Sequence, residues 1–162
     1  MHKEHQYSVT LAWTGNNGIG TSSYRSYERS YTVTGDEKPT ILGSSDPVFR
    51  GDKTRYNPEE LLLAALSGCH MLMYLHLCAE SGVIVIDYKD EATGHMQETP
   101  DGGGHFTEVI LHPSVTVTES SMIEMANNLH QEANRRCFIA RSCNFPVRHR
   151  PVTCSAGDRS ES

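Results

Sequence analysis

The most continuous apolar stretch of the chain covers residues 57–82, NPEELLLAALSGCHMLMYLHLCAESG. Its first residues carry helix start signals: Asn57 can cap a helix, Pro58 suits the first helical position, and Glu60 completes a capping box three residues after the cap. Gly82 is a natural helix stop. The pattern predicts one long helix, and its N-terminal half is apolar on nearly every side, which places it at the centre of the fold.

Segments on both sides of this helix alternate apolar and polar residues, which is the pattern of strands. Three strands are expected before the helix. After it, two longer strands flank the turn residues PDGGGH, and a further strand contains prolines, which suit the edge of a sheet. The expected strands cover residues 7–13, 23–35, 39–45, 83–96, 106–118 and 144–153.

A second helix is expected to begin near Ser121, with Glu124 completing another capping box. The order of strands, helix, strands and helix indicates an α+β fold rather than βαβ winding. One domain is predicted over residues 1–154, followed by a flexible tail at 155–162. The apolar stripe of the second helix consists of Met122, Met125, Ala126, Leu129 and Ala133, and Cys137 continues it.

Composition and charge limit the kinds of partner that the protein can have. The 162 residues are 37% hydrophobic, and the apolar residues gather in a few segments, so a second copy of the chain could complete the core. The net charge is −6, and no stripe of Lys and Arg indicates a nucleic-acid partner. Residues 1–6 are polar with no apolar signal segment after them, and the run Leu61–Leu66 is too short to cross a bilayer. We therefore expect a cytoplasmic protein without a membrane partner.

Five cysteines are distributed over the chain after residue 68. Their odd number and wide spacing differ from a secreted disulfide scaffold, and the lack of a CxxC motif argues against a zinc ribbon or a thioredoxin-type site. His70 and His76 share the long helix with cysteines, but neither completes the i, i+4 pair of a metal-binding helix, so no metal site is predicted. The other histidines are expected at the surface. The cysteines are Cys69, Cys78, Cys137, Cys143 and Cys154.

Cys69 lies in the middle of the long helix and admits two interpretations. It can be a core residue, because free cysteine is among the most buried residue types. It can also be a nucleophile, but an ordinary thiol has a pKa of about 8.5 and burial raises it, so a reactive Cys69 needs a neighbouring cation. An arginine held by a carboxylate is suitable, because its guanidinium can bond both groups. The candidate cations are Arg25, Arg29, Arg50 and Arg55.

Glu59 is the obvious carboxylate, but it precedes Cys69 by ten residues, which is about 15 Å of helix rise. The two side chains therefore cannot share a site on one straight helix. They can meet if two copies of the helix cross antiparallel near Ala64 and Ala65, where small side chains permit close approach. This geometry predicts a homodimer whose site takes Glu59 from one chain and Cys69 from the other.

The segment NPEELLLAALSGCH at residues 57–70 resembles the signature of the OsmC/Ohr proteins, the thiol-dependent hydroperoxide reductases linked to osmotic induction and organic hydroperoxide resistance. The Asn-Pro-Glu-Glu-Leu opening and the cysteine ten residues after the first glutamate carry the resemblance. The second helix ends in CFIARSCNFPV, where that family carries its second cysteine, and the chain length and element order also agree. The resemblance covers most of the chain. It implies an OsmC-like fold with antiparallel sheets around a long central helix, in an intertwined homodimer.

The resemblance also implies a peroxidase without metal or bound organic cofactor. Cys69 matches the peroxidatic cysteine, Cys137 the resolving cysteine, and Glu59 the carboxylate that orients an activating arginine. Arg50, in the loop before the long helix, is the favoured arginine, and Arg25 is the second choice. The expected reaction reduces organic hydroperoxides through a sulfenic acid on Cys69 and a disulfide with the second cysteine, which an external thiol or dithiol then reduces.

The chain departs from the family pattern around its second cysteine. Many members have Cys-Pro and then a serine there, whereas this chain has Cys137-Phe138-Ile139. Cys143, six residues later, is a second candidate for the resolving thiol, and His70 directly follows the first cysteine. The alternative to a peroxidase is a dimeric module on the same scaffold that binds a small molecule or senses redox state without turnover.

Overall fold

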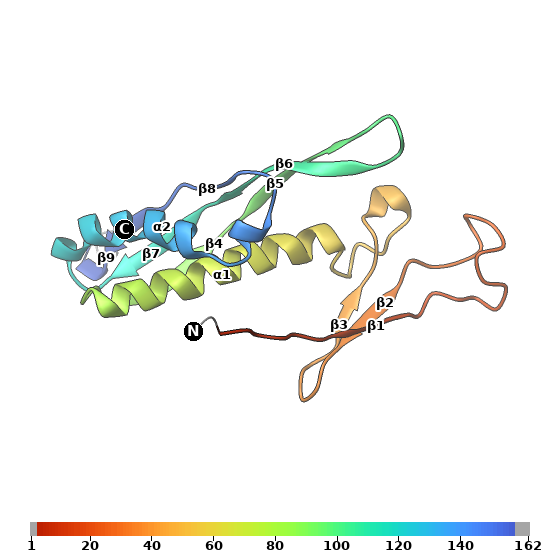
Figure 1. Ribbon diagram of the computed structural model, residues 1–162, viewed down its shortest axis with the longest axis horizontal. Coiled ribbons are helices and arrows are strands. Elements are labelled where there is room, and N and C mark those ends of the chain that lie inside the picture. Colours follow the sequence, from red (N-terminus) through yellow and green to blue (C-terminus); the bar gives the residue numbers. More distant parts are fainter. Residues whose placement is uncertain (1–2, 158–162) are drawn as a thin grey trace. The chain divides into compact units, whose positions relative to one another are not determined.

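The computed structural model describes residues 3–157, which fold into strands and helices in two compact units (Figure 1). The first unit extends to Leu61 and the second begins at Leu62, so the long helix starts in the first unit and continues in the second. The strands are β1 (Thr10–Trp13), β2 (Tyr31–Thr34), β3 (Ile41–Gly43), β4 (Val85–Asp90), β5 (Thr93–Glu98), β6 (Gly104–Leu111), β7 (Pro113–Val117), β8 (Val147–His149) and β9 (Val152–Ser155). The α-helices are α1 (Pro58–Glu80) and α2 (Ile123–Arg136), and the 3-10 helices are η1 (Pro47–Phe49), η2 (Ser120–Met122) and η3 (Ala140–Ser142).

The first unit contains an antiparallel sheet in the order β1–β2–β3. Tyr31 of β2 pairs with Trp13 of β1 on one side and with Gly43 of β3 on the other. A Cβ at Gly43 would come within 2.2 Å of the Tyr31 ring, so any larger residue there would require that ring to move. The three strands expected before the long helix are confirmed.

The loop before β2 is organised by Arg29. Its guanidinium lies 4.3 Å from the ring centroid of Tyr24 and 4.1 Å from that of Tyr27, and it donates hydrogen bonds to the backbone carbonyl oxygens of both residues. These contacts stabilise the segment from Tyr24 to Arg29 as a loop. The prediction of one strand over residues 23–35 is therefore wrong for its first part, and β2 begins only at Tyr31.

The second unit contains two three-stranded sheets, β4–β7–β9 and β5–β6–β8. In each sheet one pair is antiparallel and the other is parallel, because β8 and β9 run parallel to β6 and β7. The turn between β5 and β6 falls at the predicted position, with Gly102 in the left-handed region at φ +83°. Ser155 is a buried member of β9, and most of the expected tail, residues 158–162, lies outside the described residues.

Both long strands expected after the helix are divided, because the chain changes sheet between β4 and β5 and again between β6 and β7. Asp90 lies at the first division and His112 at the second. The Asp90 carboxylate accepts a hydrogen bond from the backbone N–H of His112 (2.6 Å) and another from the hydroxyl of Ser67 in α1 (2.5 Å). These hydrogen bonds join segments that are far apart in the sequence. They fix the two positions where the chain passes from one sheet to the other, and they hold α1 against the strands.

Helix α1 begins and ends as its sequence predicts. Asn57 accepts a hydrogen bond from the N–H of Glu60 (2.8 Å), and the Glu60 carboxylate accepts one from the N–H of Asn57 (3.0 Å), so the capping box is confirmed. Gly82 follows the helix at φ +71°. By length and composition α1 could cross a membrane, with a mean hydropathy of 1.7 over 18 residues, but core helices of water-soluble proteins pass the same test.

Helix α2 begins differently from the prediction. The short helix η2 precedes it, and no side-chain hydrogen bond caps either of them, so the capping box expected from Ser121 and Glu124 is wrong. The backbone enters α2 directly from the 3-10 turn, which already supplies local hydrogen bonds. The buried stripe also differs, because Met125 is 49% exposed and His130 is fully buried.

Two apolar clusters form the core of the second unit. The larger one joins α1, α2 and the sheet that contains β7, and the smaller one lies beside β6. The buried members of the larger cluster are Tyr74, Leu77, Cys78, Val83, Val115, Val117, Ala126 and Ala133. Those of the smaller cluster are Leu66, Val109 and Leu111.

Candidate active site

An apolar hollow of about 470 Å³ lies between the middle of α1 and the segment that follows α2. Cys69 lines it from α1 and is half-buried. Phe138 and Ile139 line it from the other side, and Phe138 is 69% exposed. A ligand bound in this hollow would contact the Cys69 thiol and would otherwise be surrounded by an almost wholly apolar surface. The lining residues are Ala65, Cys69, Leu72, Met73, His76, Phe138 and Ile139.

Cys137 ends α2 and lies next to Cys69. Its side chain is 1% exposed, and the backbone N–H of Ala140 donates to its sulfur at 3.4 Å. Burial, together with the neighbouring Cys69 thiol, raises the pKa of Cys137 to about 11. The structure therefore brings together a half-buried thiol and a buried thiol that stays protonated at neutral pH.

The other three cysteines lie in different surroundings. Cys143 packs against the smaller core cluster and donates to the carbonyl oxygen of Ile139 at 3.3 Å, and burial raises its pKa. Cys78 is buried next to Tyr74, as expected for a core residue, and burial raises its pKa. Cys154 lies in β9, with its sulfur 3.6 Å from the hydroxyl of Thr116. The described contacts thus place Cys137, rather than Cys143, beside Cys69.

Arg50 and Glu59 belong to the first unit, whereas Cys69 and Cys137 belong to the second. Arg50 is exposed and ends η1 in the left-handed conformation at φ +65°, which is uncommon for a residue with a side chain. Glu59 is half-buried at the start of α1. The pKa of Tyr31 is raised by the burial of Tyr31 and, after it, by the negative charge of Glu59. The approach of Arg50 and Glu59 to a Cys69 thiol stays a prediction.

The remaining candidate arginines differ in how far they are already engaged. Arg29 is held by two tyrosines, as described above, and Arg55 lies 3.5 Å from the carboxylate of Asp52. Arg25 is exposed in the loop before β2. Arg29 is thus engaged by aromatic rings and Arg55 by a carboxylate other than Glu59, so Arg50 stays the favoured arginine and Arg25 the second choice as a prediction.

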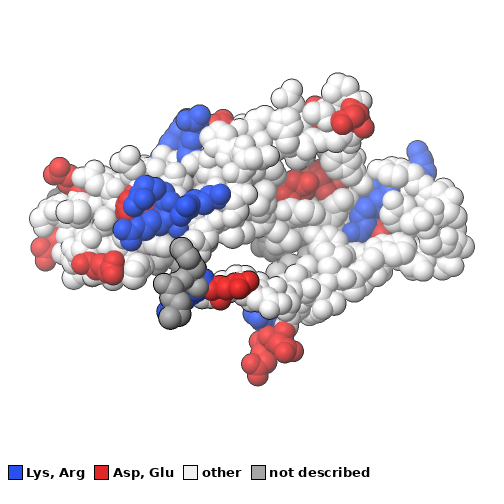
Figure 2. Space-filling model, in the orientation of Figure 1, with Lys and Arg blue, Asp and Glu red and all other residues white. Residues whose placement is uncertain are grey.

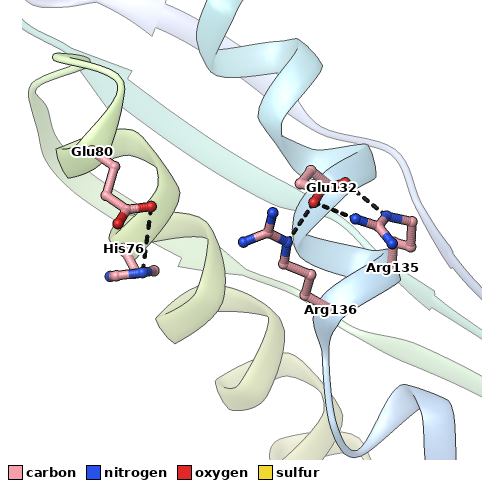
Figure 3. Close-up of polar contacts among 5 residues, drawn as sticks. All are labelled: His76, Glu80, Glu132, Arg135 and Arg136. Atoms are coloured by element: carbon pink, nitrogen blue, oxygen red, sulfur yellow. Dashed lines mark hydrogen bonds and ion pairs between the residues drawn. The ribbon is translucent and has the colours of Figure 1, made fainter.

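Ion pairs form within α1 and within α2 (Figure 3). His76 of α1 lies 3.5 Å from Glu80, and Glu132 of α2 bonds both Arg135 and Arg136. These two arginines lower the pKa of Glu132 to about 2 by hydrogen bonding and charge. On the face drawn in Figure 2, charged side chains form small groups of both signs rather than one continuous basic stripe.

The histidines are the feature that sequence reasoning missed. His70, His130 and His149 come together in the second unit, so the expectation that histidines other than His70 and His76 lie at the surface is wrong for His130, which is fully buried, and His149 is half-buried. The helical spacing could have indicated that His130 is buried, because this residue lies four after Ala126 and three before Ala133, on the same apolar face of α2. Within residues 3–157, no group of three His, Cys, Asp or Glu side chains is placed to hold a metal ion.

Comparison with known families decides the identity of the fold. A family model described as OsmC-like protein matches residues 51–150, which is more than half of the chain and includes Glu59, Cys69 and Cys137. The chain belongs to the OsmC-like family. The resemblance seen in residues 57–70 is therefore confirmed, and so is the α+β fold of the OsmC-like type.

Relatives of this OsmC-like chain cover nearly its whole length. The uncharacterized protein YmaD of Bacillus subtilis is 25% identical over 143 residues, which are 86% of this chain and 87% of YmaD. The structure of VCA0330 from Vibrio cholerae, an OsmC-like protein of unknown function, superposes with a TM-score of 0.82 at 28% identity, covering 92% of this chain and 100% of that one. An organic hydroperoxide resistance protein from Elizabethkingia anophelis shares the fold at 17% identity, with a TM-score of 0.65, covering 94% and 99%.

Proposed function

We propose that this OsmC-like protein is a thiol-dependent peroxidase that reduces organic hydroperoxides. The observation that carries the proposal is the position of Cys69, which lines an apolar hollow and lies beside the buried thiol of Cys137. A single reactive thiol needs only access to its substrate, whereas a second thiol within reach permits a disulfide cycle. Hydroperoxide resistance proteins of the same fold support this choice of reaction.

The proposed reaction begins at the Cys69 sulfur. Its thiolate attacks the terminal oxygen of a hydroperoxide, the O–O bond breaks, and the alcohol leaves after its oxygen takes up a proton. Cys69 is then a sulfenic acid. The thiol of Cys137 attacks the oxidised sulfur, a disulfide forms, and water leaves. An external thiol or dithiol reduces the disulfide by exchange and returns both cysteines to the starting state.

The walls of the hollow support organic hydroperoxides as the substrate class. Leu72, Met73, Phe138 and Ile139 offer carbon surface and few hydrogen-bonding groups. An alkyl or aryl group bound there would leave water, with a gain of about 25 cal/mol for each Å² of apolar surface buried. Hydrogen peroxide has no such group, so it should react more slowly.

The proposal includes a homodimer, because the chain alone leaves much apolar surface uncovered. Only 28% of the most apolar window of α1 is buried, and Leu72 is 66% exposed. In the first unit, alternate residues along β1 and the segment before it are also exposed: Tyr7, Val9, Leu11 and Trp13. Surface of this extent on a soluble protein indicates an interaction partner, and a second copy is the simplest one.

Within the dimer, Glu59 and Arg50 of one protomer complete the site around Cys69 of its partner. The Glu59 carboxylate orients the Arg50 guanidinium, which stabilises the Cys69 thiolate and the charge that develops on the leaving oxygen. Glu59 lies ten residues before Cys69, which is about 15 Å along α1, so it is too far away to act on Cys69 of its own chain. The proposed site therefore takes these two residues from different protomers. A reducing compartment such as the cytoplasm would supply the external thiol.

Hydroperoxide consumption with dithiothreitol as the reductant tests the proposal. Wild type should consume cumene hydroperoxide faster than hydrogen peroxide, and the Cys69→Ser variant should show no consumption above the uncatalysed rate. Cys154→Ser is the matched control, because Cys154 lies in β9 among Thr116 and Val115, and it should keep the wild-type rate. No consumption by wild type would favour a binding or redox-sensing module.

A further inference from the structure

Five aromatic side chains gather in the second unit, which we call the histidine cluster: His70 and Tyr74 of α1, Tyr88 of β4, His130 of α2 and His149 of β8. His70, Tyr74 and His130 have no exposed surface. The centroids of the three imidazole rings are 5.3 to 6.1 Å apart, and Tyr74 stacks on His130 at 3.8 Å. The proposed peroxidase reaction uses none of these side chains.

The cluster concentrates unpaired polar atoms. Each of its five side chains has a buried nitrogen or oxygen without a hydrogen-bond partner, and these five atoms are the full set of that kind found in residues 3–157. Buried polar atoms are nearly always paired, and an unpaired one costs about 1 to 3 kcal/mol. Apolar rings would pack here without that cost, which makes the cluster a candidate for a role besides packing.

One contact in the cluster joins the two helices. His70 Nε2 and His130 Nδ1 are 2.9 Å apart, and the planes of the two rings differ by 3°. The nitrogens therefore meet edge to edge, one as donor and the other as acceptor, and both rings can be neutral. Since His70 is on α1 and His130 is on α2, this hydrogen bond ties one helix to the other inside the core.

The same two helices carry the paired cysteines. Cys69 directly precedes His70, and Cys137 follows His130 by seven residues, which is about two helical turns. We propose that the buried His70–His130 contact is an acid-sensitive clamp, which holds α1 and α2 so that the thiols of Cys69 and Cys137 can pair and which releases them when the imidazoles are protonated. The inference rests on the disulfide step of the proposed function, but its test needs no hydroperoxide.

The groups that face the clamp offer no compensating negative charge. Tyr74 and Cys78 face it from α1, His149 from β8, and Tyr88 from β4. Asp90 acts on Tyr88 from β4, but its carboxylate is already bonded to Ser67 and to the backbone of His112. A first proton therefore places an unpaired positive charge in the core, and a second one makes both facing nitrogens donors.

The surroundings keep the imidazoles neutral near neutral pH. Burial and, after it, His149 lower the pKa of His70 to about 4, and burial with the two other histidines lowers that of His130 to about 3. An opened clamp would restore an ordinary imidazole pKa of about 6.5. The open form is therefore favoured as the pH falls below about 6.5, and linkage at His70 alone changes the closed-to-open ratio by about tenfold or more by about pH 5.

The test measures how readily the two cysteines close a disulfide. One equivalent of 4,4′-dithiodipyridine, which reacts with thiols in acid as well as at neutral pH, forms a mixed disulfide on Cys69. Attack by Cys137 then closes the protein disulfide and releases the second thiopyridone. Peptide mass spectrometry gives the ratio of closed disulfide to mixed disulfide at about pH 7.5 and about pH 5.

The comparison variant is H70Q/H130N, because Gln and Asn offer polar atoms near the positions of Nε2 and Nδ1 but do not titrate in this range. The thiol chemistry is common to both proteins and cancels in their ratio. We expect closure in wild type to fall more than in H70Q/H130N between the two pH values, by as much as about tenfold. His95→Asn, the same change at an exposed histidine of β5, should behave as wild type.

Equal pH profiles for wild type and H70Q/H130N would overturn the clamp. If the double variant does not fold, histidine-selective ¹⁵N NMR of wild type decides instead. Resonances of His70 and His130 that titrate together with apparent pKa values well below 6.5 support the clamp, and ordinary titration near pH 6.5 refutes it. A protein that closes its disulfide with this pH dependence but consumes no hydroperoxide would contradict the proposed function and leave the clamp supported.

Discussion

Two thiols with different surroundings lie at the centre of the candidate site. Cys69 is half-buried at the apolar hollow, and Cys137 is buried with a pKa raised to about 11. The thiolate is the reactive form of a cysteine, so the raised pKa makes Cys137 a poor candidate for the first attack on a hydroperoxide. This difference supports the proposal that Cys69 carries the first chemical step and Cys137 the second.

Removing the second thiol should expose the intermediate. In the Cys137→Ser variant the Cys69 sulfenic acid has no internal partner, so labelling of Cys69 by dimedone after hydroperoxide treatment should rise at least about tenfold over wild type. Cys143→Ser should not change the labelling, because Cys143 packs in the smaller core cluster. Increased labelling in Cys143→Ser instead of Cys137→Ser would assign the resolving role to Cys143.

The buried histidines should make stability depend on pH. The pKa values of His70 and His130 are lower in the folded protein than the ordinary value of about 6.5, so the unfolded chain binds more protons in acid. The free energy of unfolding should therefore be largest above about pH 6.5 and fall toward pH 4, by about 2 to 3 kcal/mol for His70 alone at pH 4.5.

Urea unfolding at several pH values measures this effect. The H70Q/H130N variant should lose most of the decrease, and His95→Asn should keep it. A free energy of unfolding that does not change between about pH 7 and about pH 4.5 would show that these imidazoles titrate alike in the folded and unfolded states.

At the scale of elements, α1 is the part of the fold that its own sequence determines best. Its capping box and its glycine stop are local signals, and both are present as expected. The strands after it could not be delimited in the same way. Their division depends on Asp90, which bonds Ser67 and His112 far away in the sequence, so alternation alone predicted two uninterrupted strands.

The capping box permits a direct test of helix stability. Asn57→Ala removes the acceptor for the Glu60 N–H and should lower the free energy of unfolding by about 1 kcal/mol. Asn57→Asp keeps an acceptor at the same position and should stay close to wild type. Thermal and urea unfolding compare the two variants, and equal losses would show that the side-chain cap does not contribute.

The candidate site shows the same limits of sequence reasoning. The motif in α1 indicated Glu59 and Cys69, and the end of the second helix indicated Cys137. The hollow itself could not be foreseen, because Phe138 and Ile139 reach it from a segment almost seventy residues after Cys69. The histidine cluster was missed for a related reason, since His70, His130 and His149 meet only through packing of α1, α2 and β8.

At the scale of the whole molecule, the proposed shared site requires two chains. Ala64 and Ala65 are exposed on α1 at the expected crossing of the two helices. Ala64→Glu should place a charge in that crossing, shift the protein to a monomer and abolish hydroperoxide consumption, because Glu59 and Arg50 then no longer reach the partner's Cys69. Light scattering after gel filtration measures the oligomeric state.

The matched control is Ala79→Glu, an identical change at an exposed position near the other end of α1. It should leave the protein dimeric and active. A wild-type protein that is monomeric at working concentration, or an Ala64→Glu monomer with full activity, would contradict the shared site.

The most direct measurement is the mass of the wild-type protein after one equivalent of cumene hydroperoxide without added reductant. The proposed disulfide cycle predicts the loss of two hydrogen atoms, cumyl alcohol as the product, and a disulfide between Cys69 and Cys137 in the peptide map. An unchanged mass with intact hydroperoxide, or oxidation that spares Cys69, would contradict the proposed peroxidase reaction.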